Sequence, residues 1–226
     1  GMNRALIMNL GFDEKFIVRA LTRHGVSKGD KVMLLTGPMV ERVEKAATYI
    51  KEFLDKYHPG EAEIELITLP IEDFYKAVSK AIEILKKASK AKEIIVNLSG
   101  GMRITILAIF TALLLLGLKN LTLELESEDT SVYLTLDIKA LKSLLTIEEL
   151  SEEKKEILKI LASKDKPTTV TELASTLEKD VSTMRKHLKE LKERGLIIVK
   201  KKKPLIVERH PILDCYLTIK KGNRVR

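Results

Sequence analysis

The sequence predicts a two-domain protein, with an α/β domain built on a mostly parallel sheet and a small basic domain of helices and a hairpin. Three observations support this prediction. Apolar strands alternate with amphipathic helices over residues 2–136, and paired glycines join the fourth strand to a long apolar helix. The excess positive charge falls within residues 151–226. A chain of 226 residues is long enough for both domains to bury a core.

The spacing of apolar residues locates each element of the first domain. Strands that alternate with helices through short connections favour a mostly parallel sheet with helices on both faces. The expected strands cover residues 4–10, 31–36, 63–68 and 93–97, and a hairpin at 121–125 and 132–136 closes the sheet. The expected helices begin at Asp13 and then cover 39–57, 71–87 and the stretch from the glycine turn to Leu118.

The turn after the fourth strand predicts an anion site. A strand that passes through Gly100 and Gly101 into a helix leaves backbone N–H groups free at the positive end of that helix. An anion can approach closely there because glycine lacks a Cβ. Arg103 stands in the first helical turn, where the helix dipole disfavours a cation, so we expect it to face an anion. Ser99 is either a helix N-cap or a phosphate contact.

The other strand ends extend this site. Parallel sheets bind ligands outside the carboxyl ends of their strands, and glycine-bearing turns follow three expected strands, at residues 9–12, 36–38 and 97–103. Each glycine taken singly is most simply part of a plain turn, but three such turns on one sheet edge favour a binding site. The predicted ligand-binding residues are Leu10, Gly11, Phe12, Asp13, Thr36, Gly37, Asn97, Ser99, Gly100, Gly101, Met102 and Arg103.

Motifs for enzymatic chemistry are weak. The glycine turn lacks the spacing and the lysine of a P-loop, and no dinucleotide-binding glycine motif follows the first strand. The segment Leu98-Ser99-Gly100 lacks the first glycine of a nucleophile elbow, and Asp13 opens a helix more naturally than it serves as a base. The four histidines have no metal-ligand spacing. We therefore expect a protein that is not an enzyme, without catalytic residues, metal or cofactor.

Charge and composition indicate the partner and the compartment. Residues 1–150 hold 20 Lys and Arg against 21 Asp and Glu, whereas residues 151–226 hold 20 against 11, a net charge of +9. Such a local basic excess is typical of a module that binds a polyanion. A single cysteine, no signal-peptide pattern and an apolar tract shorter than a membrane span predict a cytoplasmic protein without a membrane partner. The absence of Gln and Trp, with abundant Lys and Glu, is typical of thermophiles.

Residues 151–226 predict three helices and a basic hairpin. The helices are expected at residues 152–162, 169–177 and 180–194, the second opened by a capping box and the third capped by Asp180. Two apolar runs then flank a turn of four lysines and Pro204. One lysine run is usually a solvated turn, but this order is that of a winged helix-turn-helix, whose third helix enters the major groove. The predicted DNA-binding residues are Ser182, Thr183, Arg185, Lys186, Lys189, Lys200, Lys201, Lys202 and Lys203.

Residues 137–150 lie between the predicted domains. Their apolar side chains recur at helical spacing, which predicts a helical and partly buried connector instead of a flexible linker.

Two motifs give the chain a family resemblance. Residues 9–13, after the first strand, and residues 97–103, after the fourth, match the two motifs of a known family. Over nearly its whole length the chain resembles the CRISPR-associated regulators that join a CARF (CRISPR-associated Rossmann fold) domain to a winged helix-turn-helix. The resemblance implies a Rossmann-like sheet and a homodimer that binds a cyclic oligoadenylate, cyclic tetraadenylate before others, across its two-fold axis. It also implies control of CRISPR genes in antiviral defence, with double-stranded DNA bound at a palindromic promoter site.

Two other functions stay open at this point. Some CARF domains cleave their ligand, so one alternative is a ring nuclease or another nucleotide-processing enzyme with an accessory DNA-binding domain. Turnover of a labelled cyclic oligoadenylate would reveal such an enzyme. The other alternative is a winged helix used for protein contacts, which would show little salt-dependent affinity for DNA.

Overall fold

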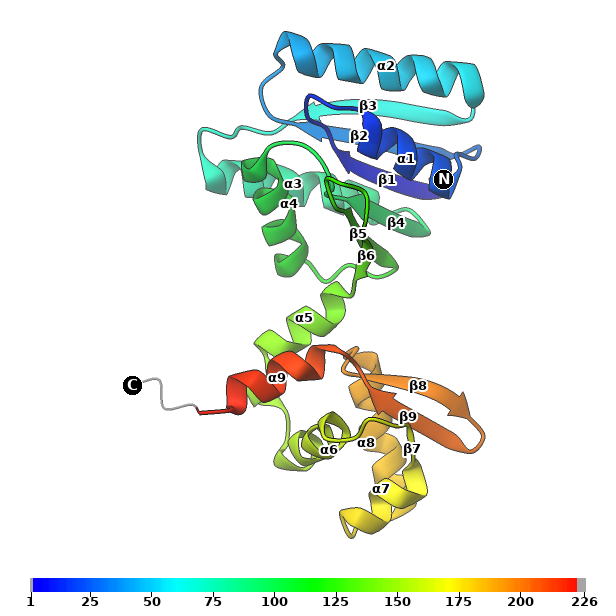
Figure 1. Ribbon diagram of the computed structural model, residues 1–226, viewed down its shortest axis with the longest axis vertical. Coiled ribbons are helices and arrows are strands. Elements are labelled where there is room, and N and C mark those ends of the chain that lie inside the picture. Colours follow the sequence, from blue (N-terminus) through cyan, green and yellow to red (C-terminus); the bar gives the residue numbers. More distant parts are fainter. Residues whose placement is uncertain (1, 223–226) are drawn as a thin grey trace. The chain divides into compact units, whose positions relative to one another are not determined.

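The computed structural model describes residues 2–222, and the chain forms two compact units, one ending at Ile138 and the other beginning at Lys139. The N-terminal unit is a six-stranded sheet flanked by helices (Figure 1), which confirms the predicted α/β class. Its elements are β1 (Arg4–Asn9), α1 (Lys15–His24), β2 (Asp30–Thr36), α2 (Glu41–Tyr57), β3 (Ala62–Thr68), α3 (Phe74–Ala88), β4 (Glu93–Asn97), α4 (Arg103–Leu115), β5 (Leu121–Glu126) and β6 (Tyr133–Leu136).

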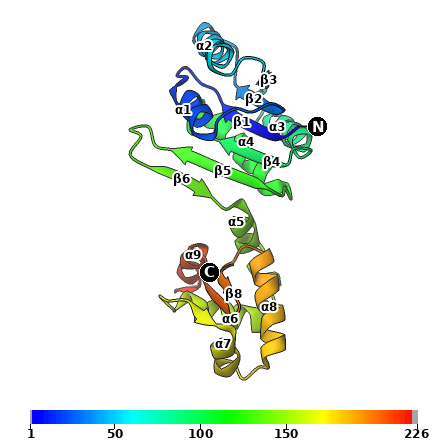
Figure 2. The same cartoon turned by 90° about the vertical axis from the view of Figure 1, so that its right-hand side faces the viewer.

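The sheet has the strand order β3-β2-β1-β4-β5-β6, in which β1 to β5 run parallel and β6 is antiparallel to β5. Helices α1 and α2 cover one face and α3 and α4 cover the other (Figure 2). Side chains alternate between the faces of a strand, so Leu6, Met8 and Leu34 pack beneath α1 and α2 while Ile7 and Met33 are buried on the opposite face.

Strand β1 marks the point where the strand order reverses. It pairs with β2, which follows it through α1, and with β4, which follows α3 on the opposite face. Doubly wound sheets open a crevice at the carboxyl ends of two such neighbouring strands, because their connections leave in opposite directions. The loop after β1 (residues 10–14) and the loop after β4 (residues 98–102, the β4–α4 loop) therefore meet at this point.

Helix α4 is apolar around its circumference. It buries Ala108, Ile109 and Leu113 in the N-terminal unit but leaves Leu107 and Leu115 exposed. The helix begins at Arg103 and ends at Leu115, not at the predicted Leu118, because the backbone becomes extended at Leu116.

The C-terminal unit has the three-helix core and β-hairpin of a winged helix-turn-helix, as predicted. Its elements are α5 (Ile138–Leu145), the 3-10 helix η1 (Ile147–Glu149), α6 (Glu152–Ala162), β7 (Thr168–Thr169), α7 (Val170–Thr176), α8 (Val181–Glu193), β8 (Ile197–Lys202), β9 (Leu205–Arg209) and α9 (Ile212–Lys220). Strand β9 pairs with both β7 and β8. Leu158, Leu173, Leu188 and Val207 meet in the core.

Two features of this unit go beyond the sequence prediction. Ala140, Ile147 and Leu150 belong to its core, so residues 139–150, which the sequence places in a connector, are packed within the C-terminal unit. Helix α9 follows the hairpin and buries Leu213 and Tyr216 in the same core.

The sequence predicted a turn that contains all four lysines, and this prediction is wrong because the turn is shorter. Strand β8 continues through Lys202, pairing Lys202 with Leu205, and only Lys203 and Pro204 form the turn. Lysines suit this strand because β8 lies at the edge of its sheet, where charged side chains remain in water.

The N-terminus of α8 is held by Asp180. Its Oδ1 accepts the backbone N–H of Thr183 at 2.7 Å, and the hydroxyls of Ser182 and Thr183 donate to the same carboxylate at 2.7 and 2.8 Å. These hydrogen bonds, the backbone bond from Thr183 foremost, favour the ionised form and lower the pKa of Asp180 to about 2.

We expect Asp180→Asn to weaken the acid-dependent part of the stability. Because the folded pKa is lowered, the ionised carboxylate contributes fully above its unfolded pKa of about 4. That contribution is lost as the pH falls through about 2. Asparagine still accepts a cap hydrogen bond, so the helix should persist. Urea unfolding across this pH range should show wild type more stable near neutral pH and the difference shrinking in acid. A difference that does not change with pH would contradict this account.

Candidate functional site

The loops after β1 and β4 are in direct backbone contact. A Cβ added to Gly11 would lie 2.7 Å from the Cα of Gly101, and one added to Gly101 would lie 2.3 Å from Nδ2 of Asn9. Gly101 also has a φ of +91°, which favours glycine. The buried Asn9 side chain donates from Nδ2 to the carbonyl of Gly100 at 2.7 Å. The glycines therefore bring the two predicted motifs together.

A pocket of about 360 Å³ opens beside this contact at the carboxyl ends of the strands. Most of the predicted ligand-binding residues line it, together with four apolar residues that the sequence analysis did not select. The predicted residues in its walls are Leu10, Gly11, Phe12, Asp13, Thr36, Gly100, Gly101 and Met102. The additional ones are Phe16, Pro38, Val40 and Val43. Phe16 and Val43 were missed because their spacing is that of ordinary core residues, whereas Pro38 and Val40 lie in the loop before α2, of which only the turn at 36–38 was placed near the site.

The pocket combines apolar walls with few polar side chains. Asp13 and Thr36 are the polar side chains among its lining residues. The guanidinium carbon of Arg42, in the first turn of α2, lies 4.5 Å from the ring centroid of Phe12, which is within cation–π range. A flat apolar group suits such walls, and Arg42 places a positive charge beside one of them. The sequence analysis missed Arg42 because nothing in its local sequence distinguishes it from a solvated helix residue.

The other predicted residues, Gly37, Asn97, Ser99 and Arg103, do not line the pocket. Gly37 makes room for Met102, because a Cβ there would lie 2.5 Å from the Met102 Sδ. Arg103 is exposed on the first turn of α4, and its side chain forms no hydrogen bond or ion pair with another residue of 2–222. The N-cap of α4 is Met102, so Ser99 does not cap that helix.

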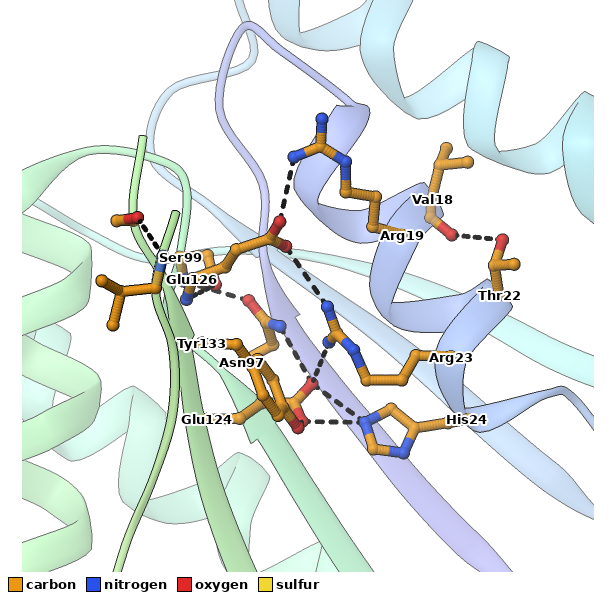
Figure 3. A network of polar contacts seen from close by, with 12 residues as sticks. Val18, Arg19, Thr22, Arg23, His24, Asn97, Ser99, Glu124, Glu126 and Tyr133 are labelled. Atoms are coloured by element: carbon orange, nitrogen blue, oxygen red, sulfur yellow. Dashed lines mark hydrogen bonds and ion pairs between the residues drawn. The ribbon is translucent and has the colours of Figure 1, made fainter. Parts of the chain in front are cut away.

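Asn97 and Ser99 belong to a polar network centred on Glu124 (Figure 3). Asn97 Nδ2 donates to Glu124 Oε1 at 3.0 Å, and Asn97 Oδ1 accepts the backbone N–H of Ser99 at 3.0 Å. Tyr133 Oη donates to Glu124 Oε2 at 2.6 Å, and His24 Nε2 lies 2.8 Å from that oxygen. The sequence analysis missed this network, because its members come from α1, β4, β5 and β6.

The charge of Glu124 is stabilised within the fold. Burial by itself raises the pKa of this fully buried carboxyl, but hydrogen bonds from Tyr133, Asn97 and His24 outweigh that effect and lower it. Glu126 is also nearly buried and pairs with Arg19 at 3.0 Å and with Arg23 at 3.4 Å. The network therefore ties α1 to the β5–β6 hairpin through ionised groups.

The C-terminal unit has unpaired cations on α8 and on the hairpin. Several of its acidic side chains pair with lysines elsewhere, for example Glu153 with Lys179 at 3.1 Å and Glu148 with Lys155 at 3.1 Å. Within residues 2–222 no ion pair involves the predicted DNA-binding side chains Arg185, Lys186, Lys189, Lys201, Lys202 and Lys203. The exception is Lys200, which lies 3.5 Å from Glu208.

A groove of about 170 Å³ separates α8 from the hairpin. Its lining residues are Arg185, Leu188, Lys189, Lys192, Val199, Lys202 and Leu205. Lys192 was not predicted, although its helical spacing from Arg185 and Lys189 places it on the same face. Ser182 is exposed and Thr183 half-buried, and both hydroxyls already donate to Asp180.

Metal sites and membrane spans are not found among residues 2–222. In this range no three His, Cys, Asp or Glu side chains are grouped closely enough to hold a metal ion. No helix in the same range has the length and apolar character needed to cross a membrane.

Comparison with known proteins follows the same division into two units. Residues 4–137 match the family described as the Csa3 CRISPR-associated Rossmann-like domain, and residues 150–200 match a helix-turn-helix domain. The fold and sites thus define a protein with a Rossmann-like domain and a helix-turn-helix domain. The chain belongs to the Csa3 CRISPR-associated family, which confirms the resemblance drawn from its two motifs.

A curated relative carries the same family name. The chain is 27% identical over 207 residues to the CRISPR locus-related protein Csa3 of Saccharolobus solfataricus, whose name also proposes DNA binding. That match covers 88% of this chain and 81% of the relative. The structure of protein VC1899 from Vibrio cholerae matches with a TM-score of 0.44 at 9% identity, covering 94% of this chain and 63% of that one. So weak a structural similarity says nothing about function.

We expect Gly11→Ala to destabilise the N-terminal unit by about 1–3 kcal/mol, because the added methyl group would overlap the backbone of Gly101. Gly117→Ala is a matched control, since a Cβ there meets no atom within 4 Å. Urea unfolding of the two variants measures the difference. Equal stability of the Gly11 variant and the control would show that the loops separate at little cost.

Proposed function

We propose that this protein is a CRISPR-associated transcriptional regulator that binds a cyclic oligoadenylate in its Rossmann-like domain and DNA through its winged helix-turn-helix. Ligand binding is proposed on one observation, the pocket where the strand order reverses. Gly11 and Gly101 bound this pocket, and the N-terminus of α4 adjoins it. A cyclic oligoadenylate offers both flat bases and phosphates. The apolar walls suit a base, and Arg103 with the free N–H groups of α4 suits a phosphate.

A homodimer is part of this proposal. Ile104, Leu107 and Leu115 on α4 are 42%, 56% and 64% exposed, although they are large apolar residues. Several exposed apolar side chains on one surface helix favour contact with another protein surface. A second copy of the chain is the natural occupant, because a two-fold axis would present paired phosphate sites to a symmetric ring.

The proposal that the C-terminal unit binds DNA rests on the unpaired cations of α8 and the hairpin. Arg185, Lys189 and Lys192 share one helix face, and Lys202 faces them across the groove. The third helix of a winged helix-turn-helix enters the major groove, so these side chains would meet base edges and phosphates. In a dimer, two such helices would read the halves of a palindromic promoter site.

We propose regulation, not catalysis, as the role of the ligand. The polar side chains that line the pocket, Asp13 and Thr36, form no hydrogen-bonded pair of nucleophile and base. Incubation of the pure protein with labelled cyclic tetraadenylate tests this point. Stoichiometric recovery of the intact ring supports a regulator, and linear products formed over many turnovers would favour a ring nuclease.

We expect Arg103→Ala to weaken binding of cyclic tetraadenylate by roughly 10- to 100-fold, the range for loss of a hydrogen bond to a charged group. The apo fold should be unaffected, because Arg103 has no partner among the described residues. Titration calorimetry measures the affinity, and Lys119→Ala removes an exposed cation beyond the other end of α4 as a control. Undiminished binding by the Arg103 variant would place the phosphates elsewhere, and no binding by wild type would refute this ligand.

We expect the triple change of Lys201, Lys202 and Lys203 to Ala to weaken binding to all DNA duplexes and to reduce the salt dependence. Each phosphate that the variant no longer neutralises should lower the slope of log K against log salt by about 0.9. Arg185→Ala should mainly reduce discrimination between sequences, by about 1–3 kcal/mol. Lys155→Ala is the control, because that lysine is paired with Glu148 and Glu152. An unchanged salt slope in the triple variant would exclude the hairpin from the interface.

A further inference from the structure

The carboxylate of Glu124 is fully buried and lies among the side chains of Asn97, Tyr133 and His24 (Figure 3). It accepts hydrogen bonds from Asn97, Tyr133 and His24, which belong to three other elements of the sheet and its helices. None of the activities considered so far requires this arrangement. A buried charge is costly unless it is fully hydrogen-bonded, so its position suggests a role that an apolar side chain could not fill.

An ionised carboxylate can only accept hydrogen bonds, and this fixes the amide of Asn97. The Nδ2 group of Asn97 must face Glu124, and so its Oδ1 must face the other way. There Oδ1 accepts the backbone N–H of Ser99 at 3.0 Å. The charge on Glu124 therefore determines which atom of Asn97 meets the first residues of the β4–α4 loop.

Ser99 is held from a second direction by the strand that carries Glu124. The backbone N–H of Glu126 donates to Ser99 Oγ at 2.8 Å, and the backbone N–H of Leu98 donates to the carbonyl of Glu124 at 3.2 Å. Gly100 and Gly101, which bound the pocket, follow Ser99 directly. Strand β5 and its buried carboxylate thus set the path by which the chain enters the pocket.

The same carboxylate also holds the last strand of the sheet. Tyr133, in β6, donates to Glu124, and the guanidinium carbon of Arg23 lies 4.1 Å from the centroid of the Tyr133 ring. Strand β6 is followed along the chain by Ile138, at the end of the N-terminal unit. The buried carboxylate therefore contacts Asn97, the last residue before the β4–α4 loop, and Tyr133 in the last strand of the sheet.

We propose that Glu124 is a positioning residue that sets the conformation of the β4–α4 loop through the amide of Asn97. Its effect on loop order follows from the hydrogen bonds alone, whereas its effect on ligand affinity rests on the proposed function. Loss of the correct amide orientation would leave Ser99 N–H without an acceptor and would loosen the loop around Gly100 and Gly101.

A compensating pair of substitutions tests this positioning role. Asn97→Asp places a second carboxylate 3.0 Å from Glu124 and should disrupt the contact by repulsion. In the double variant Asn97→Asp with Glu124→Gln, the amide introduced at position 124 donates to the carboxylate introduced at position 97, while its oxygen accepts from Tyr133 and His24. The carboxylate at position 97 still accepts the N–H of Ser99, so the hydrogen bond between positions 97 and 124 is restored with donor and acceptor exchanged. The contacts of His24 and Arg23 with Glu124 Oε1, at 3.0 and 3.7 Å, are the ones that the double variant does not restore.

Hydrogen exchange of the backbone amides of Leu98 and Ser99, which donate to the carbonyl of Glu124 and to Asn97 Oδ1, is the primary measurement, made on the full chain without ligand. We expect Asn97→Asp to lower protection of these amides at least tenfold and the double variant to restore it to within about twofold. Glu128→Gln, an exposed change in the β5–β6 turn, is the control and should leave protection unchanged. Native protection in Asn97→Asp, or a double variant no better protected than that single variant, would overturn the proposal.

Two further measurements separate this inference from the proposed function and from unfolding. Affinity for cyclic tetraadenylate should follow loop protection across the same variants. If wild type binds none, the proposed function fails, but hydrogen exchange in the single and double variants still tests the role of Glu124. Should Asn97→Asp unfold, Tyr133→Phe removes a hydrogen bond to the same carboxylate more gently. It should lower protection of the Leu98 and Ser99 amides more than Glu128→Gln does. Equal protection in those two variants would also refute the proposal.

Discussion

The backbone contact between Gly11 and Gly101 is the constraint on which the N-terminal unit depends. It occurs where β1 and β4 lie side by side and their connections depart to opposite faces of the sheet. Any side chain at either position would overlap atoms of the other loop or of Asn9. With only hydrogen atoms between them, the two loops close over a buried asparagine and leave a pocket beside it.

The pocket and the polar network contact different residues of the β4–α4 loop and use opposite chemistry. The pocket is walled by side chains such as Phe12, Phe16 and Met102. The network is built from ionised groups around Glu124 and Glu126, both of which are nearly or fully buried. A loop bounded on one side by apolar walls and on the other by directional hydrogen bonds has few alternative conformations, which suits a site that must be ready before a ligand arrives.

Two groups of lysines can be distinguished in the C-terminal unit: those held in ion pairs, and those that line the groove between α8 and the hairpin. Lys155 and Lys179 are held by glutamates that bridge helices. Arg185, Lys189 and Lys202 have no acidic neighbour of that kind and gather along one groove. Ion pairs within the unit therefore occupy several lysines away from the groove and leave the cations that line it without acidic partners among the described residues.

The sequence by itself determined the α/β class, the helix-turn-helix, the family and most of the pocket, because those features depend on local patterns. Apolar periodicity, caps such as Asp180 and paired glycines act within a few residues of the chain. Only the tertiary structure decided that the Ser99 hydroxyl accepts a hydrogen bond from the backbone of β5 instead of capping α4. It also decided that β8 extends through Lys202 and that Glu124 lies at the centre of a polar network. His24 and Glu124 are 100 residues apart, and Asn9 and Gly100 are 91 apart. Such contacts are fixed by strand order and register, which no local pattern in the chain encodes.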